Sequence, residues 1–265
     1  MSDDQAQPTE EQRVKQLWSG TPYHEYGRAV APAAGDIVDF VGVSESDQVL
    51  DVACGTGNTA ITAARRGADA TGIDLSEEML EWAEENAGLI DADIDFRRGD
   101  ACDLPVEDDA FDITLSTFGH HLSSDPIGAT RELARVTRPG GTVGFTAYGR
   151  ESGSAKTFEI LSEHHPELTY EQAIAPYKLG DEEFVAEQFG DLFESLSFET
   201  GEIRMQAVSP RHFWDYLLDI LDSVRVPYEQ ANNKDELMDE WVELAEQKWE
   251  RNAGVVEYLI VKGEV

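Results

Sequence analysis

The sequence predicts a doubly wound α/β domain, a mostly parallel sheet covered by helices on both faces. Between residues 48 and 148, short apolar segments alternate with amphipathic segments, which is typical of repeated strand–helix–strand units. The first apolar segment runs through a glycine-containing turn directly into a helical segment. With 265 residues, 41% of them hydrophobic, the chain is long enough to bury a large core.

The first half of the chain supplies the predicted parallel sheet. Residues before about position 10 are polar, and helices are expected at 11–18 and 28–41. Pro139, Gly140 and Gly141 predict a sharp turn ahead of the fifth strand. We expect strands at 48–53, 69–74, 94–99, 111–117 and 142–148, and helices between them at 59–66, 77–87 and 125–136.

The second half predicts a helical cap and the remaining strands. Helices are expected over most of 154–193 and at 210–221 and 234–249, and extended segments at 196–208 and 255–261. The sequence shows no internal repeat and no low-complexity linker. One domain with a helical cap is therefore the simplest organisation.

The composition is strongly acidic, with 54 Asp and Glu against 20 Lys and Arg and a formal net charge of −34. This charge repels phosphate backbones and anionic lipids, so we expect neither a nucleic-acid partner nor a membrane partner. The acids are spread along the whole chain, which indicates a protein adapted to a high-salt cytoplasm. A cytoplasmic location is expected because no signal peptide, membrane span or disulfide framework is recognisable.

A glycine loop and an acidic residue predict a cofactor site. In VLDVACGTGNTA (49–60), Gly55 and Gly57 permit a tight turn into a helix whose first N–H groups face the ligand. Asp74 ends the next strand, where its carboxylate can accept hydrogen bonds from a ribose diol. These features indicate an adenosine-type cofactor. Gly55, Gly57 and Ala60 also satisfy the fingerprint of nicotinamide and flavin enzymes, so the loop alone leaves the cofactor open.

Four motifs together resemble the class I S-adenosylmethionine-dependent methyltransferases, in particular the group that includes ubiquinone/menaquinone-biosynthesis methyltransferases. They are DVACGTG (51–57), TGIDLSEEML (71–80), GDACDLPVEDDAFD (99–112) and RPGGTVGF (138–145). Ala53 stands where many members have the first glycine of the loop. The resemblance covers roughly residues 48–148 and is loose outside them.

The resemblance implies which residues bind the methionine and ribose portions of S-adenosylmethionine. The ribose hydroxyls would be held by Asp74, with Leu75 and Met79 packing near the adenine. The methionine portion would be surrounded by Asp51, Ala53, Cys54, Gly55 and Gly57.

The remaining cofactor contacts are implied in the same way. Asp100 would accept from the adenine amino group, and the N–H of Ala101 would meet the ring. Tyr23 and Arg28 would close over the amino-acid end of the cofactor. The side facing methyl transfer would be lined by Ser116, Thr117 and Phe118.

The likeness also implies a Rossmann-like sheet of seven strands, with residues 255–261 inserted antiparallel beside 196–208. The implied reaction transfers a methyl group from S-adenosylmethionine to an O, N or C nucleophile of a small molecule, leaving S-adenosylhomocysteine. A nicotinamide-dependent oxidoreductase and a non-catalytic S-adenosylmethionine-binding protein are the alternatives, and a monomer or homodimer is expected. The chain then divides into an N-terminal helical segment closing over the cofactor (1–47), a cofactor-binding core (48–148), a helical cap with the substrate region and one core strand (149–252), and a final strand (253–265).

His120 and His121 are the candidate catalytic residues. They follow the fourth predicted strand, in a loop that borders the transferred methyl in the resembled fold. An imidazole there can take a proton from the acceptor, because its unperturbed pKa lies near 6.5. The alternative is that the pair lines the pocket or caps the next helix. We expect only one of the two to take part in catalysis, and we favour His121.

No metal site is expected. Asp91, Asp93 and Asp95 imitate a calcium loop, but the sixth and twelfth positions of that loop are not Gly and Glu. His164 and His165 have no partner cysteines or spaced acids that indicate zinc.

Overall fold

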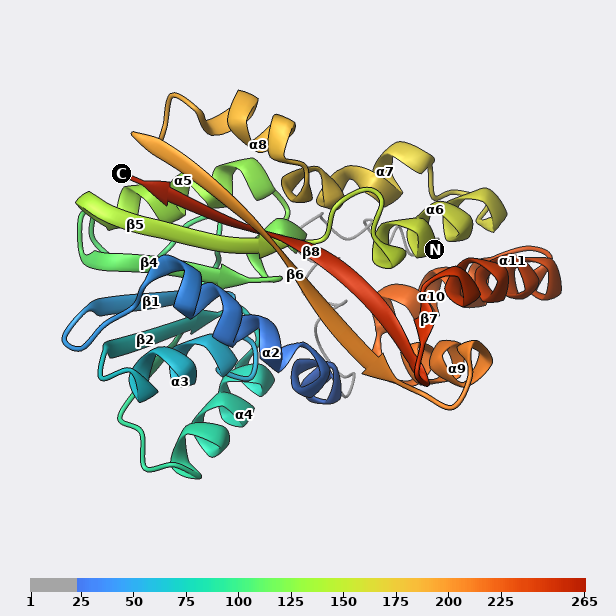
Figure 1. Cartoon of the computed structure of the whole chain (residues 1–265), viewed down its shortest axis with the longest axis horizontal. Helices are drawn as coiled ribbons and strands as arrows, with labels where there is room; N and C mark the ends of the chain where they lie inside the picture. Colours follow the sequence, from blue (N-terminus) through green and yellow to red (C-terminus); the bar gives the residue numbers. More distant parts are fainter. Residues whose placement is uncertain (1–22) are drawn as a thin grey trace, which may run out of the picture.

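The computed structural model describes residues 23–265, which contain one sheet flanked by helices (Figure 1). Seven strands follow one another in the order β3-β2-β1-β4-β5-β8-β6, and the two-residue β7 pairs with β8 off this path. The predicted seven-stranded sheet is therefore confirmed, with one short strand added. The strands are β1 (Gln48–Val52), β2 (Asp69–Asp74), β3 (Asp95–Arg98), β4 (Phe111–Thr117), β5 (Thr137–Ala147), β6 (Ser195–Gln206), β7 (Trp249–Glu250) and β8 (Ala253–Glu264).

The first five strands in the sheet order are parallel to one another, and β8, the sixth, is antiparallel to its neighbours. Pairing between β3, β2, β1, β4 and β5 is parallel throughout. Helices provide the crossovers from β1 to β2, from β2 to β3 and from β4 to β5, whereas residues 99–110 connect β3 to β4 without a helix. β8 lies between β5 and β6 and is antiparallel to both, as predicted. The strand order reverses between β1 and β4, which creates a crevice at their carboxyl ends.

Helices cover both faces of the sheet (Figure 1). α2 (Tyr23–Val41) and α3 (Asn58–Arg65) lie on one face, and α5 (Pro126–Val136) and α8 (Glu182–Phe189) on the other. Successive side chains of a strand point to opposite faces of the sheet, so neighbouring residues pack into different hydrophobic cores. Val49 joins the cluster that includes Ile37 of α2, whereas Leu50 joins the cluster that includes Leu133 of α5. This burial on both faces explains the continuous apolar runs that predicted the strands.

The cap gathers at one end of the sheet, reached by the long antiparallel pair of β6 and β8 (Figure 1). Trp214 and Trp241 are buried there in the same cluster as Ile37, so the cap continues one of the two cores. The last helix packs one face inward, with Leu237, Met238 and Trp241 buried. The remaining helices are α4 (Glu77–Gly88), η1 (His120–Leu122), α6 (Gly153–His164), α7 (Tyr170–Ile174), η2 (Ala175–Gly180), α9 (Pro210–Ile220), α10 (Asp222–Gln230) and α11 (Lys234–Gln247).

Several boundaries differ from those predicted. The expected turn at 139–141 lies inside β5, where residues 138–141 loop out between the pairs Phe111–Thr137 and Ile113–Thr142. Residues 222–230, left without a prediction, form α10 although Pro227 lies within it. α2 already includes Tyr23, ahead of the predicted start at 28. The helix predicted at 11–18 lies outside the described residues.

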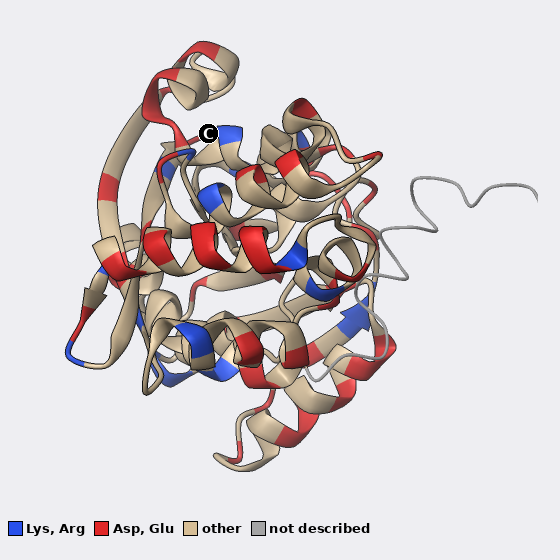
Figure 2. Ribbon diagram, turned by 90° about the vertical axis from the view of Figure 1, so that its right-hand side faces the viewer, with Lys and Arg blue, Asp and Glu red and all other residues tan. Residues whose placement is uncertain are grey.

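Acidic residues are spread over many of the helices (Figure 2). α4 shows the pattern, because its apolar residues Met79 and Leu80 are buried while its acids face solvent. Five exposed glutamates lie on that single helix, at positions 77, 78, 81, 84 and 85. Among residues 23–265, no helix has both the length and the apolar composition needed to cross a bilayer.

Molar salt is expected to stabilise this protein strongly. A net charge of −34 produces self-repulsion in the compact state, and the screening length falls to about 3 Å at 1 M salt. The melting temperature should therefore rise steadily between about 0.1 and 2 M KCl. A melting temperature that is flat or falls over this range would show that the acidic surface is not an adaptation to salt.

Candidate cofactor site and active site

A cleft lies at the carboxyl ends of β1, β2 and β4, at the point where the strand order reverses. Its walls come from the loop after β1, the end of β2, the loop after β3 and the segment after β4, and α2 contributes to one side. Ligands of open α/β sheets bind at this reversal point. The fold therefore brings predicted cofactor residues to one place from five separate segments of the chain.

Positive φ angles shape the loop after β1. Ala53, Gly55 and Gly57 have φ values of 53°, 52° and 80°. Glycine adopts this region freely, whereas alanine at 53 carries strain of about 1–2 kcal/mol. This accounts for the glycine that many members of the resembled family have there. A Cβ on Gly119 would lie 2.5 Å from the Cβ of Ala53, so the loops after β1 and β4 pack directly on each other.

Asp51 lines the cleft from β1 with only 1% of its surface exposed. Its Oδ2 accepts the backbone N–H of Ala60 in α3 at 3.0 Å, whereas its Oδ1 has no hydrogen-bond partner among the described residues. Burial raises the pKa of this carboxyl to about 8. The charged form of a buried carboxyl with an unpartnered oxygen is costly, so without a ligand Asp51 is mostly protonated at neutral pH. The ammonium group of a bound methionine portion would supply the missing donor and the opposite charge.

Asp74 lines the same cleft from the end of β2. Its Oδ2 accepts the N–H of Gly55 at 2.8 Å, and its Oδ1 accepts the N–H of Ser76 at 2.9 Å. Burial raises the pKa of this carboxyl, and hydrogen bonds from the backbone N–H groups of Ser76, Gly55 and Leu75 oppose the rise. Each oxygen keeps further capacity to accept. The carboxylate is thus held in one orientation and can still accept both hydroxyls of a ribose.

The residues predicted to lie near the adenine also line this cleft. Leu75, Met79, Asp100 and Ala101 all line the cleft, and the Oδ1 of Asp100 accepts the N–H of Cys102 at 2.9 Å. Cys54, Thr117, Phe118 and Tyr23 line it as well. All but three of the predicted cofactor residues therefore lie in one cleft.

The three exceptions are Gly57, Ser116 and Arg28, and each has a structural reason. Gly57 begins α3, and a Cβ there would meet Ala83 at 3.1 Å. Ser116 is fully buried, and its Oγ donates to the carbonyl of Val52 at 2.8 Å. The guanidinium of Arg28 is 70% exposed and pairs with a neighbouring glutamate on α2. None of these three residues lines the cleft, and their predicted contacts with the cofactor stay predictions.

The cleft is also lined by residues that were not predicted to contact the cofactor. Asn58 donates from Nδ2 to the carbonyl of Gly27 at 2.9 Å, which ties α3 to α2. The proximity of Asn58 to the glycine loop was a usable signal, but nothing local predicted that α2 would pack over that loop. The additional lining residues are Gly27, Val30, Thr56, Asn58, Thr59, Gly99, Gly119, Leu122, Ser123 and Ser124.

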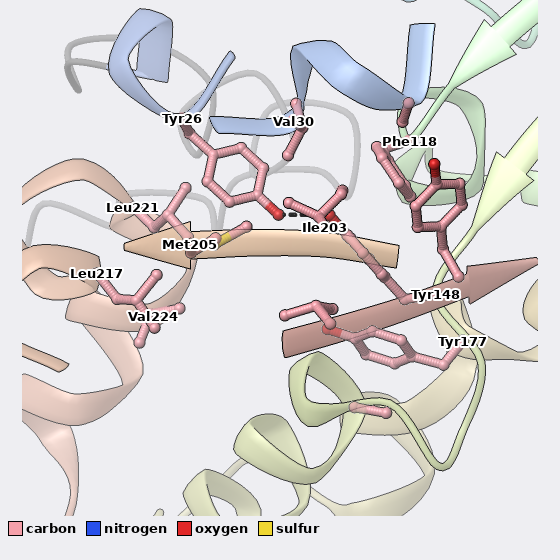
Figure 3. Packing of buried hydrophobic residues seen from close by; sticks show 14 of the residues in the cluster. Tyr26, Val30, Phe118, Tyr148, Tyr177, Ile203, Met205, Leu217, Leu221 and Val224 are labelled. Atoms are coloured by element: carbon pink, nitrogen blue, oxygen red, sulfur yellow. Dashed lines mark hydrogen bonds between the residues drawn. The ribbon is translucent and has the colours of Figure 1, made fainter. Parts of the chain in front are cut away.

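A second and larger cavity, of about 600 Å³, lies between the cleft and the cap. Tyr23 and Leu122 line both spaces, so the two adjoin at these residues. Figure 3 shows Tyr26 of α2 and Tyr148 pointing toward each other, joined by a hydrogen bond of 2.8 Å between their hydroxyls. Tyr148 also stacks on Phe118 of the cleft, with ring centroids 4.3 Å apart. Aromatic side chains therefore form the wall where the two spaces meet.

The two adjacent histidines have different surroundings. His121 lines the second cavity, whereas His120 lines neither space and packs edge-on against Phe145, with ring centroids 4.9 Å apart. Both are entirely buried, and none of their ring nitrogens has a hydrogen-bond partner among the described residues. Burial lowers the pKa of each to about 3. The expectation of an unperturbed pKa is thus wrong, and both rings are neutral at neutral pH.

Replacing His120 with phenylalanine is expected to stabilise the fold, and more so at lower pH. The unfolded histidine has a pKa near 6.5 and the folded one about 3, so the unfolded state binds more protons between these values. The free energy of unfolding therefore falls as the pH drops below about 6.5. At about pH 5 this loss amounts to roughly 2 kcal/mol for one histidine.

Urea denaturation at about pH 7 and about pH 5 measures this effect. Phenylalanine keeps the ring contact with Phe145 and has nothing to protonate. A stability difference between the variant and the wild type that does not grow at the lower pH would contradict the burial of a neutral His120.

The other polar candidates have structural partners. The Nε2 of His164 is hydrogen-bonded to the Oε2 of Glu240 in α11, at 3.1 Å. The Nε2 of His165 is hydrogen-bonded at the same distance to the Oε1 of Gln230, at the end of α10. Burial raises the pKa of the Cys54 thiol, which makes it a poor nucleophile. Within residues 23–265, no three His, Cys, Asp or Glu side chains gather in a way that could hold a metal ion.

A family profile described as a methyltransferase domain matches residues 49–141. An uncharacterized protein of Mycobacterium tuberculosis is 30% identical over 204 residues, 74% of this chain and 73% of that protein. A second one from the same organism is 30% identical over 178 residues, so the match spans 64% of its length. The ubiquinone/menaquinone biosynthesis C-methyltransferase UbiE of Bdellovibrio bacteriovorus is 40% identical over 116 residues, 43% of this chain and 49% of that enzyme.

Solved structures show the same fold at low sequence identity. The YcgJ protein of Bacillus subtilis superposes with a TM-score of 0.60 at 18% identity, over 87% of this chain and 96% of that one. The [4+2]-cyclase SpnF superposes with a TM-score of 0.57 at 19% identity, over 97% of each chain. The residues of the cleft, rather than the fold, therefore have to carry any argument about chemistry.

Proposed function

Because this chain belongs to the class I S-adenosylmethionine-dependent methyltransferases, we propose that it transfers a methyl group from this cofactor to an O, N or C nucleophile of a small molecule. The observation that carries the proposal is a pair of carboxyl groups in one cleft, the buried Asp51 and the half-buried Asp74. Asp51 offers an unpartnered oxygen that suits an ammonium group, and Asp74 offers two anchored oxygens that suit a ribose diol. A nicotinamide cofactor would instead bring its anionic pyrophosphate to the glycine loop, beside Asp51.

The cofactor, when bound, supplies an electrophilic methyl group: the acceptor forms a bond to that carbon while the C–S bond breaks, its electron pair stays on sulfur, and S-adenosylhomocysteine leaves. The protein mainly has to bind, align and exclude water, which is the proximity effect. The close packing of Ala53 against Gly119 holds the cofactor loop against the segment after β4. Phe118, with Tyr148 stacked on it, continues that wall toward the second cavity.

His121 is proposed as the group that receives the acceptor's proton. It lines the cavity next to the cleft, is neutral, and has no other hydrogen-bond partner among the described residues. A neutral ring nitrogen can accept the hydrogen bond of an O–H or N–H group before reaction and take its proton as the methyl group is transferred. His120 is not proposed for this role, because it faces Phe145 and lines neither space.

The acidic surface supports a small-molecule acceptor rather than a nucleic acid or a membrane. We further propose a cytoplasmic monomer or homodimer in which residues 48–148 bind the cofactor and 149–252 recognise the acceptor. Of the segment 1–47 that was expected to close over the cofactor, residues 1–22 lie outside the described residues.

S-Adenosylhomocysteine is expected to raise the melting temperature, whereas NAD and NADP are not. At about 100 times its dissociation constant, a ligand that binds only the folded state adds about 2.7 kcal/mol to stability. Thermal denaturation with each of the three compounds at equal concentration measures this. Stabilisation by NAD or NADP alone would overturn the proposal in favour of an oxidoreductase. Stabilisation by S-adenosylhomocysteine without methyl transfer to any acceptor would favour the non-catalytic alternative.

A further inference from the structure

We propose, on the basis of the function above, that the second cavity binds the methyl acceptor and selects an uncharged, largely apolar molecule with a hydroxyl group that donates to His121. The cavity volume of about 600 Å³ lies within the range of sites for drug-sized ligands. It adjoins the cofactor cleft at Tyr23 and Leu122, so a molecule inside it reaches the methyl group from the cap side.

The walls of the cavity are mainly apolar and come from both the core and the cap. Met205, Leu217 and Val224 line one side of the cavity in the view of Figure 3, and Tyr148 and Tyr177 line the other. Trp241 of α11 adds a further aromatic surface. Such walls favour a ligand whose body is apolar, because burying unpaired polar groups against them would cost free energy.

Most polar groups of the inner wall already have partners within the protein. The hydroxyls of Tyr26 and Tyr148 bond each other at 2.8 Å, and that of Tyr177 bonds Ser154 at 3.0 Å. The indole N–H of Trp241 donates to the hydroxyl of a neighbouring threonine at 2.9 Å. Because these groups already form hydrogen bonds within the protein, they do not require polar groups on a ligand.

His121 differs from these groups, because its ring is entirely buried, lines the cavity and has no hydrogen-bond partner among the described residues. Buried polar atoms almost always have a partner, so this one points to a donor on the ligand. Since the imidazole is neutral, it can accept from a hydroxyl and offers no positive charge to a carboxylate.

The lysines at the cavity edge are already neutralised. Lys156 lies 3.0 Å from Glu159 and 3.5 Å from Glu151, and Lys248 pairs with Glu257. Glu151 and Lys248 are exposed, so this edge faces solvent. An anionic acceptor would have to compete with these glutamates for the lysines, and an uncharged one would not.

Equilibrium dialysis of the full-length protein, saturated with S-adenosylhomocysteine, tests the proposal with three matched probes: 2-naphthol, naphthalene and 2-naphthoate. We expect 2-naphthol to bind about three- to tenfold more tightly than naphthalene, the effect of one hydrogen bond. We expect 2-naphthoate to bind at least about tenfold more weakly than 2-naphthol, because its charge would be buried without a partner. Equal or tighter binding of 2-naphthoate would overturn the proposal.

Two variants locate the binding. In His121→Phe, the preference for 2-naphthol over naphthalene should disappear while naphthalene affinity is kept; an unchanged preference would overturn the role of His121. Ala245→Phe, which places a ring in the cavity from α11, should lower the affinity for naphthalene and 2-naphthol at least about tenfold. The control Glu246→Phe, on the exposed face of the same helix, should bind both probes normally.

Binding of S-adenosylhomocysteine distinguishes failure of the proposed function from failure of the proposed acceptor site. If this ligand fails to bind the wild type, the proposed function fails. If it binds the wild type and both α11 variants equally while Ala245→Phe still takes up the probes normally, the cavity is not their site and only the present inference fails.

Discussion

Replacing His121 with asparagine is expected to lower turnover about 10²–10⁴-fold, the usual contribution of a general base. Affinity for S-adenosylhomocysteine should stay unchanged, because His121 lines the second cavity and not the cofactor cleft. Asparagine keeps a hydrogen-bond acceptor but cannot take up a proton, so the variant separates proton transfer from positioning. Single-turnover kinetics with an identified acceptor measure the rate directly.

The low pKa of His121, about 3, is compatible with this role. A hydroxyl oxygen that has gained a methyl group before losing its proton is a far stronger acid than the free hydroxyl, so a weak neutral base suffices. The folded-state pKa also predicts a pH profile: the ring is already deprotonated above about pH 4, and turnover should show no inflection near 6.5 that depends on this residue.

The control for this experiment is His120→Phe, which should retain near-normal turnover because His120 lines neither space. If His121→Asn also keeps normal turnover, the histidine pair is structural. Deprotonation then belongs to water, to another group, or to an acceptor that is already ionised.

Replacing Asp74 with alanine is expected to weaken S-adenosylhomocysteine binding roughly ten- to hundredfold. Hydrogen bonds to a charged group contribute about 1.5–3 kcal/mol, and Asp74 is the carboxylate placed to accept from the ribose diol. Its two backbone donors, the N–H groups of Gly55 and Ser76, also lose their acceptor in this variant, so the cofactor loop loses an anchor at the same time. Isothermal titration calorimetry measures the affinity.

Two further variants separate these contributions. Asp74→Asn keeps the size of the side chain and one acceptor oxygen, and it should lose less affinity than the alanine variant. Asp69→Ala removes an exposed carboxylate at the opposite end of β2 and should bind normally. Wild-type affinity in Asp74→Ala would show that this residue does not hold the ribose.

The sequence by itself determined the sheet and one half of the site. β2 and β4 have the predicted bounds, because apolar runs bounded by turn residues are local signals. The position of Asp74 followed from the same patterns, since it ends a parallel strand and such ends meet at one edge of a sheet. The role of Asp51 was implied by the family resemblance of the motif that contains it.

The tertiary structure alone decided which neighbouring residues face the site. His120 and His121 are adjacent and chemically identical, yet one faces Phe145 and the other a cavity. Tyr23 and Arg28 lie on one helix, yet only Tyr23 reaches the cleft. Their orientations depend on how α2 and η1 pack against distant segments, and the histidine pKa values depend on the resulting burial. Cavities and desolvation arise between elements, so no local pattern in the chain could specify them.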